Sequence, residues 1–375
     1  MTMRFGNPDR PNSYIGKTVP RPNAARLVQG RGQYVDDIVL PRMVHVVFVR
    51  SPYAHAKIKG IDASEALAVK GVLRVFTGAD IAAVCTPWVG VLAHLKGLKS
   101  PPEYAIAVDR AAWVGEPVAA VVASTRLAAE EAAALVDVDY DPLPEVTDMM
   151  TALDDATPVL HPDMGDNLAF ERTHVEGDID AAFASAHKVI EAHFKTGRHT
   201  GVTLEPRSIL VDWNPGEGQM TAWHATQAPH MVQVVLAEHL GMPESRVRVI
   251  CGDVGGSYGI KVHIYPDEVA TAAIAKIMAR PVKFIADRLE SFTTDIHARD
   301  HEIWGRIAVA EDGEILAFDI DDWTAIGAYS VYPRTSAIEG NQVVNLCGGP
   351  YDFKNYRAKT TVVFQNKTPT SQYRA

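Results

Sequence analysis

The sequence has few cysteines and no spacing typical of a disulfide framework or a zinc site. Its three cysteines, Cys85, Cys251 and Cys347, are far apart in a chain of 375 residues, and no C-x-x-C occurs. The fourteen histidines include no H-E-x-x-H. His297 and His301 are four residues apart, but their polar surroundings favour surface or hydrogen-bonding roles. We therefore expect no metal ion held by side chains, and we expect Cys251 to be a buried small hydrophobic residue.

Long apolar runs and an excess of positive charge are also missing. The apolar runs Val44–Val49 and Val118–Ala123 have the length of strands, far short of a membrane-spanning helix. The first fourteen residues are polar and lack the apolar core of a signal peptide. The net charge of −10 argues against nucleic acid or an anionic membrane as a partner. These absences predict a cytoplasmic protein.

A glycine-rich stretch, Gly252–Lys261, lies between a predicted strand and a predicted helix. Its four glycines permit positive φ and a close approach of another molecule to the main chain. The stretch is neither a P-loop, because Ile260 precedes Lys261, nor a G-x-G-x-x-G motif. From the residues alone, a packing turn and a cradle for an anionic or polar cofactor are equally good interpretations.

Helical and strand patterns mix along the chain and predict a mixed α/β (α+β) fold. Residues 1–19 form a predicted tail, and residues 20–145 a first α/β unit. Residues 141–167 hold four prolines among acidic and polar residues, which predicts a linker on the surface at residues 146–166. Residues 167–375 form the second unit.

The second unit carries two clear helix signals and one hairpin signal. Predicted helices at Pro229–Leu240 and Pro266–Met278 each begin with a proline that suits the first helical position. Asp312-Gly313 lies between two alternating runs and predicts a β-hairpin.

Short motifs that are weak singly occur together, in order, over more than three hundred residues. They are Ile15–Arg21, Gly30–Asp37, Arg50–Ala56, Val114–Ala119, Val138–Pro144, Leu204–Arg207, Thr226–His230, Gly252–Lys261, Arg280–Lys283 with Asp287-Arg288, and Asn366–Pro369 with Tyr373-Arg374. In this order they resemble the large, molybdenum-cofactor-binding subunit of the xanthine dehydrogenase, aldehyde oxidase and aerobic carbon monoxide dehydrogenase family. The resemblance implies an a/b hammerhead domain over residues 20–145, followed by the first, incomplete half of a molybdopterin-binding domain over residues 167–375.

The resemblance also implies a function. The chain would be a component of a molybdenum hydroxylase or dehydrogenase that oxidises an aldehyde or an N-heterocycle at carbon, with water as the oxygen source. Its cofactor would be molybdenum with molybdopterin in the cytosine dinucleotide form, and the pterin rather than the protein would hold the metal. Electrons would pass to 2Fe-2S clusters and FAD on partner subunits.

The family's large subunit is about twice as long as this chain. The partners that the resemblance implies are therefore the C-terminal half of the large subunit, an FAD-binding medium subunit and a 2Fe-2S small subunit. The family's catalytic glutamate would lie in that C-terminal half, so we expect no catalytic residue in this chain. The alternatives are a non-catalytic scaffold or assembly protein and a truncated large subunit without independent activity.

Several residues match the family's cofactor contacts. Gln227 matches the glutamine that contacts the apical oxo group of the metal, whereas the residues alone favour a solvent-exposed side chain. The loop beside the metal is matched by Gly255, Gly256, Ser257, Tyr258 and Gly259. Tyr258 stands where an aromatic side chain flanks the substrate, and its alternative is a place in the core.

Other residues bear on the substrate. Arg374 matches the arginine that faces the substrate, and its alternative is an ordinary surface arginine. Val262 occupies the position of a glutamate in members that oxidise purines, which disfavours a purine bound in their way. Ala375 stands where the copper-containing carbon monoxide enzymes carry a cysteine, which disfavours that chemistry.

Three charged residues near the glycine-rich stretch have predicted structural roles. We expect Glu205 to be a hydrogen-bonded structural carboxylate rather than a general base. We expect Lys261 to lie at the surface or to support the loop. Asp253 is expected to accept backbone N–H bonds in a turn.

Overall fold

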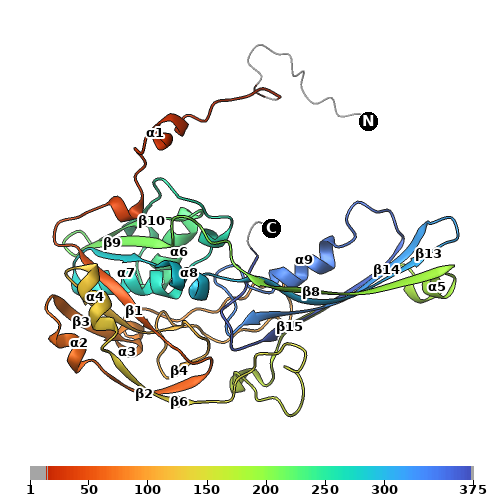
Figure 1. Ribbon diagram of the computed structural model, residues 1–375, viewed down its shortest axis with the longest axis horizontal. Helices are drawn as coiled ribbons and strands as arrows, with labels where there is room; N and C mark the ends of the chain where they lie inside the picture. Colours follow the sequence, from red (N-terminus) through yellow and green to blue (C-terminus); the bar gives the residue numbers. More distant parts are fainter. Residues whose placement is uncertain (1–13, 15, 373–375) are drawn as a thin grey trace.

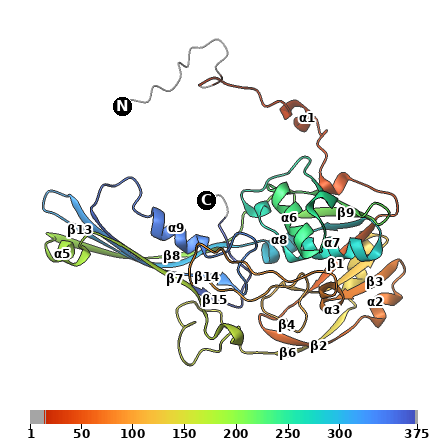
Figure 2. The same ribbon diagram turned by 180° about the vertical axis from the view of Figure 1, so that it is seen from behind.

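The computed structural model describes residue 14 and residues 16–372, which form a body and a long arm (Figures 1 and 2). The body contains a seven-stranded sheet in the order β11-β10-β9-β12-β1-β5-β3. The arm is a five-stranded sheet in the order β7-β15-β14-β13-β8. A third sheet, β4-β2-β6, lies at the lower side of the body in Figure 1. The mixed α/β class predicted from the sequence is confirmed.

The elements have the following bounds. The strands are β1 (Val44–Arg50), β2 (Ala56–Asp62), β3 (Val72–Thr77), β4 (Arg110–Ala111), β5 (Pro117–Ala123), β6 (Asp137–Pro142), β7 (Leu168–Glu176), β8 (Lys188–His199), β9 (Ser208–Asn214), β10 (Gln219–His224), β11 (Val247–Ile250), β12 (Val282–Ile285), β13 (Ala298–Val309), β14 (Ile315–Gly327) and β15 (Asn355–Phe364). The α-helices are α1 (Ala24–Val28), α2 (Ser64–Ala68), α3 (Gly78–Ala82), α4 (Arg126–Ala133), α5 (Ile179–Ala184), α6 (Pro229–His239), α7 (Pro266–Met278), α8 (Arg288–Thr294) and α9 (Ile338–Leu346). Short 3-10 turns are η1 (Val35–Asp37), η2 (Pro162–Met164), η3 (Glu244–Arg246) and η4 (Ile260–Val262).

The seven-stranded sheet takes strands from both predicted units of the chain. Strand β1 pairs in parallel with β12, with Val44 opposite Val282, and antiparallel with β5. Strands from residues 20–145 and from residues 167–375 therefore share one sheet, a pairing that the sequence did not reveal. Every residue of β5 is buried, as expected for an apolar strand inside such a sheet.

Two of the helices that pack on this sheet bear out the sequence signals. Helix α7 spans the range predicted from the sequence and packs against β9 and β12. Helix α6 begins at Pro229 as predicted and packs against β11. Ala270 and Ile274 of α7 are fully buried in the main core.

The arm is built on the predicted hairpin. Strands β13 and β14 pair antiparallel around Asp312-Gly313, where Gly313 has a φ of 92°. Helix α9 packs on β14 and β15, and α5 lies near the tip of the arm (Figure 1). Neither β7 nor α9 was predicted from the sequence.

Residues 146–166 differ from the predicted surface linker. Val146, Met149 and Leu160 are buried and pack together with Ala325 of β14 and Val363 of β15. The backbone N–H of Val146 also donates to the Asn366 side chain at 2.8 Å. The prediction that this segment lies on the surface is therefore wrong for Val146, Met149 and Leu160, which attach it to the arm, whereas Leu153 and Val159 are exposed.

Over residue 14 and residues 16–372, no helix has both the length and the apolar character needed to cross a membrane.

Candidate cofactor site

The glycine-rich stretch runs from the end of β11 to the start of α7 and needs its glycines. Gly256 and Gly259 have φ values of 103° and 102°, and Tyr258 between them also has a positive φ of 53°. Gly255 is required for a different reason, because a Cβ atom there would lie 2.5 Å from the Cβ of Glu205. The loop is therefore held in a conformation that larger residues would disturb.

A buried ion pair supports this loop from behind. The Oε2 atom of Glu205 accepts hydrogen bonds from the Gly255 N–H at 2.6 Å and from Lys261 Nζ at 2.9 Å. The Lys261 side chain is only 1% exposed, and its burial lowers the pKa of its ammonium group. The predicted structural role of Glu205 is confirmed. Lys261 supports the loop, and its alternative placement at the surface is wrong.

Gln227 lies beside the loop, two residues before the first residue of α6. Its backbone N–H donates to the Lys261 carbonyl at 2.9 Å. Its side-chain Oε1 accepts hydrogen bonds from the Ser257 hydroxyl and from the Gly259 N–H. Within the described part of the chain, its Nε2 donor has no hydrogen-bond partner. The amide therefore fixes the loop with its oxygen and leaves its nitrogen for a ligand.

Three consecutive backbone N–H groups of the loop are also unused. The N–H groups of Gly255 and Gly259 bind Glu205 and Gln227, whereas those of residues 256–258 have no acceptor among residues 16–372. Successive free N–H groups in a turn with positive φ form a concavity that suits an anionic oxygen. Together with the Gln227 amide, they make a surface rich in hydrogen-bond donors.

The predicted cofactor residues lie around two adjoining cavities. The first has a volume of about 470 Å³ and is lined by Gln227, Ser257, Tyr258, Gly259, Val262, Arg334 and Gln372. The second has a volume of about 560 Å³, and Gly255 and Gly256 contribute to its wall. Tyr258 lines both cavities, and its side chain is half exposed, so its alternative place in the core is wrong.

Sequence reasoning missed two residues of the first cavity, Arg334 and Gln372. They come from the segment after β14 and from the segment after β15, and neither belongs to a pattern that signals a site. The carbonyl of Gln372 lies 3.3 Å from the buried His263 ring nitrogen Nε2. The predicted substrate residue Arg374, like Ala375, lies outside the described residues.

The prediction for Asp253 in the loop was only partly correct, and the prediction for Cys251 just before the loop was wrong. Asp253 accepts the Gln33 N–H at 2.8 Å as expected, but its main partner is Arg26, at 2.6 and 2.7 Å. This guanidinium lowers the pKa of Asp253 to about 2. The predicted burial of Cys251 is wrong, because it is exposed at the end of β11.

The described residues contain no group of three or more His, Cys, Asp or Glu side chains that could hold a metal ion. The two histidines four residues apart make hydrogen bonds, as predicted. His301 Nδ1 lies 2.6 Å from buried Asp322, and His297 Nε2 lies 2.9 Å from the Phe292 carbonyl. The described residues by the glycine-rich loop offer hydrogen-bond donors.

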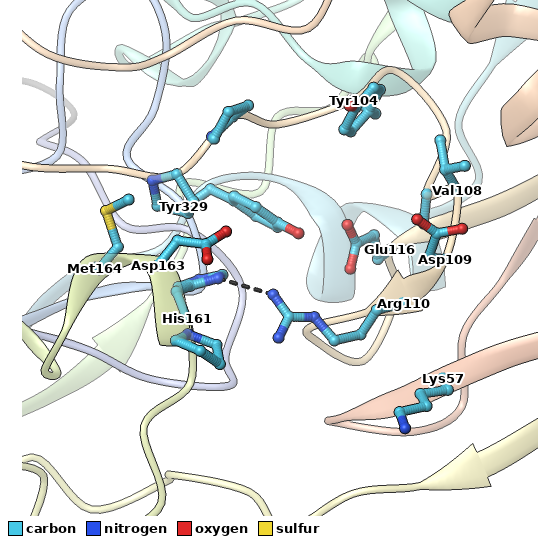
Figure 3. Close-up of a pocket in the computed structure, with 14 residues that line it drawn as sticks. Lys57, Tyr104, Val108, Asp109, Arg110, Glu116, His161, Asp163, Met164 and Tyr329 are labelled. Carbon is cyan, nitrogen blue, oxygen red and sulfur yellow. Dashed lines mark hydrogen bonds between the residues drawn. The ribbon is translucent and has the colours of Figure 1, made fainter.

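A separate hollow of about 540 Å³ lies between the small sheet and residues 161–164 (Figure 3). Arg110 and His161 point toward each other in it, with Nη2 and Nδ1 2.9 Å apart. The Glu116 carboxylate accepts the Ala112 N–H at 2.6 Å, and burial raises the pKa of Glu116 to about 7. The Arg110, His161 and Glu116 side chains in this hollow are therefore already paired with protein atoms.

Comparisons with known families and proteins agree with this geometry. The model of the molybdopterin cofactor-binding domain matches residues 160–375. The a/b hammerhead domain of aldehyde oxidase and xanthine dehydrogenase matches residues 29–144. The order of the two domains predicted from the motifs is therefore confirmed.

Individual proteins are similar over nearly the whole chain. The nicotine 6-hydroxylase large subunit of Paenarthrobacter nicotinovorans is 36% identical over 89% of this chain and 41% of its own length. The crystal structure of quinoline 2-oxidoreductase from Pseudomonas putida 86 has a TM-score of 0.91 and 34% identity, over 96% of this chain and 46% of its own. The chain thus spans less than half of these two relatives. It covers 81% of the nicotinate dehydrogenase large molybdopterin subunit of Eubacterium barkeri, at 28% identity.

Proposed function

Because the chain belongs to the aldehyde oxidase and xanthine dehydrogenase family, we propose that it forms one wall of the molybdenum cofactor site of a hydroxylase or dehydrogenase. The observation that carries this proposal is the cluster of unused donors, namely Gln227 Nε2 and the N–H groups of residues 256–258. The bound cofactor would supply the redox chemistry at the substrate carbon.

The chain's own residues would position this cofactor. Gln227 would donate its Nε2 hydrogen bond to an oxo ligand of the metal, near the N-terminus of α6, whose dipole favours negative charge. The free loop N–H groups would bind an anionic oxygen of the cofactor. Glu205 and Lys261 would keep the loop in place without touching the cofactor.

The opposite wall would come from the second cofactor-binding half of the large subunit, which would also carry the catalytic glutamate. Medium and small subunits would hold FAD and 2Fe-2S clusters and take the electrons away. We propose the cytosine dinucleotide form of the cofactor and a cytoplasmic complex.

The substrate would be an aldehyde or an N-heterocycle that enters the 470 Å³ cavity. Tyr258 would flank it with an aromatic ring, and Arg374 would orient a carbonyl or a developing negative charge. Val262 in the cavity wall offers no carboxylate to a purine.

The test is the Gln227→Ala variant in the complete complex, purified with its partner subunits. We expect turnover to fall about 100-fold, the effect of removing one preorganised donor, while the complex stays folded and loses only about 1–3 kcal/mol of stability with the two loop hydrogen bonds of Oε1. Gln29→Ala, which removes an exposed amide from the end of α1, is the matched control. Equal turnover in Gln227→Ala and the control would show that Gln227 has no role in the site. An intact complex without molybdenum would favour the scaffold alternative.

A further inference from the structure

We infer that Arg334 selects a substrate that carries a carboxylate group, an inference that rests on the proposed function of the same cavity. The substrate class would be an anionic aldehyde or N-heterocycle, bound so that its carboxylate pairs with the Arg334 guanidinium. The inference depends on three features of the structure: the charge of the cavity, the anchoring of the loop that carries Arg334, and the character of the remaining wall.

Arg334 supplies the only formal charge among the described residues that line the 470 Å³ cavity. Its side chain is exposed, and it makes no hydrogen bond or ion pair with residues 16–372. An unpaired arginine is notable in a chain with a net charge of −10, where carboxylates are plentiful. Buried His263 stays neutral at pH 7 because burial lowers its pKa to about 4, so it adds no second cation.

The backbone around Arg334 is fixed by buried hydroxyl groups. The Ser330 and Thr335 hydroxyls lie 2.8 Å apart, and the Ser330 hydroxyl also accepts the Ser336 N–H at 3.0 Å. The Ser336 hydroxyl in turn accepts the Val331 N–H at 3.0 Å. All three hydroxyl-bearing side chains are buried. Arg334 therefore extends from an ordered loop, which reduces the ordering cost of binding a ligand.

The rest of the wall suits a flat ring with one anionic end. Tyr258 and Val262 offer aromatic and aliphatic surface, and Gln227 and Gln372 offer neutral amides. The described residues that line this cavity include no Asp or Glu, so they present no carboxylate that would repel an anion. A guanidinium binds a carboxylate through two parallel hydrogen bonds, a geometry that a neutral aldehyde or heterocycle cannot reproduce.

The experiment compares Arg334→Gln, Arg334→Lys and the wild type in the complete complex. The probes are two pairs, 4-carboxybenzaldehyde with benzaldehyde and quinoline-4-carboxylate with quinoline. We expect Arg334→Gln to lower kcat/KM for the carboxylated member of at least one pair by about 10- to 100-fold, mainly through KM, and to leave the neutral member unchanged. Arg334→Lys should restore part of the loss. Arg248→Gln, an exposed arginine on β11, is the control for lost surface charge.

A binding measurement tests whether Arg334 binds a carboxylate, without requiring turnover. Calorimetric titration with benzoate should show binding to the wild type and at least tenfold weaker binding to Arg334→Gln, with benzamide unaffected. Equal losses for neutral and carboxylated probes, or no benzoate binding to the wild type, would overturn the inference. Loss of molybdenum and nucleotide from Arg334→Gln would also overturn it, because Arg334 would then bind a phosphate of the cofactor. A wild-type complex without molybdenum would instead refute the proposed function.

Discussion

The Lys261→Met substitution tests whether the pair of Lys261 and Glu205 holds the glycine-rich loop. It removes the ammonium group that lies 2.9 Å from Glu205 Oε2, in a place where the two side chains are 1% and 13% exposed. Leaving one partner of a buried pair uncompensated typically costs about 3–5 kcal/mol. Glu205 keeps its hydrogen bond from the Gly255 N–H, and the lysine no longer has to be desolvated. We therefore expect a loss of about 3 kcal/mol in the free energy of unfolding.

A double variant separates the ion pair from simple packing. Glu205→Gln with Lys261→Met replaces both charges by neutral groups of similar size, and the glutamine oxygen can still accept the Gly255 N–H. We expect the double variant to recover about 1.5–2 kcal/mol relative to Lys261→Met alone, because no buried charge remains unpaired.

The assays are chemical denaturation and molybdenum analysis of the purified complex. Lys261→Met should lose both stability and molybdenum, and the double variant should regain part of each. The free energy of unfolding is also measured for Glu205→Gln alone. The reasoning is refuted if the losses of the two single variants sum to the loss of the double variant within about 0.5 kcal/mol, because the effects of independent sites add to that degree.

Two further predictions concern stability. Arg207→Met should lower the free energy of unfolding by about 3–5 kcal/mol in a denaturant titration, because it leaves Asp267 and Asp295 buried without their 2.6 Å partner; an unchanged midpoint would contradict this. Glu103→Gln should flatten the pH dependence of stability between pH 5 and 8. Burial raises the pKa of Glu103 to about 8, so the folded state binds a proton that the unfolded state has lost, and the wild type loses stability as pH rises through this window. The glutamine can still accept the 2.9 Å hydrogen bond from Trp88, and equal pH profiles for the variant and the wild type would be evidence against this account.

The sequence predicted the parts of the site that depend on local backbone demands. Gly256 and Gly259 have positive φ, and helix α7 begins at the proline that marked it. Such features are visible in a short stretch of residues, so the loop and Gln227 could be identified from motifs, and the structure places them side by side.

Features that depend on contacts between distant segments left no such trace. The pairing of β1 with β12 joins two predicted units into one sheet. Neither strand carries a local sequence signal that identifies its pairing partner. Arg334 reaches the cavity only because the loop after β14 folds beside the glycine-rich stretch. The burial of Lys261 was missed because a lysine usually lies at the surface unless it is paired.

The central claim is that this chain forms a wall of a molybdenum cofactor site. The most direct test is to purify the complete complex and measure molybdenum and cytidine nucleotide against the amount of this chain. The account predicts equimolar molybdenum and nucleotide. A folded, intact complex that contains neither would contradict it.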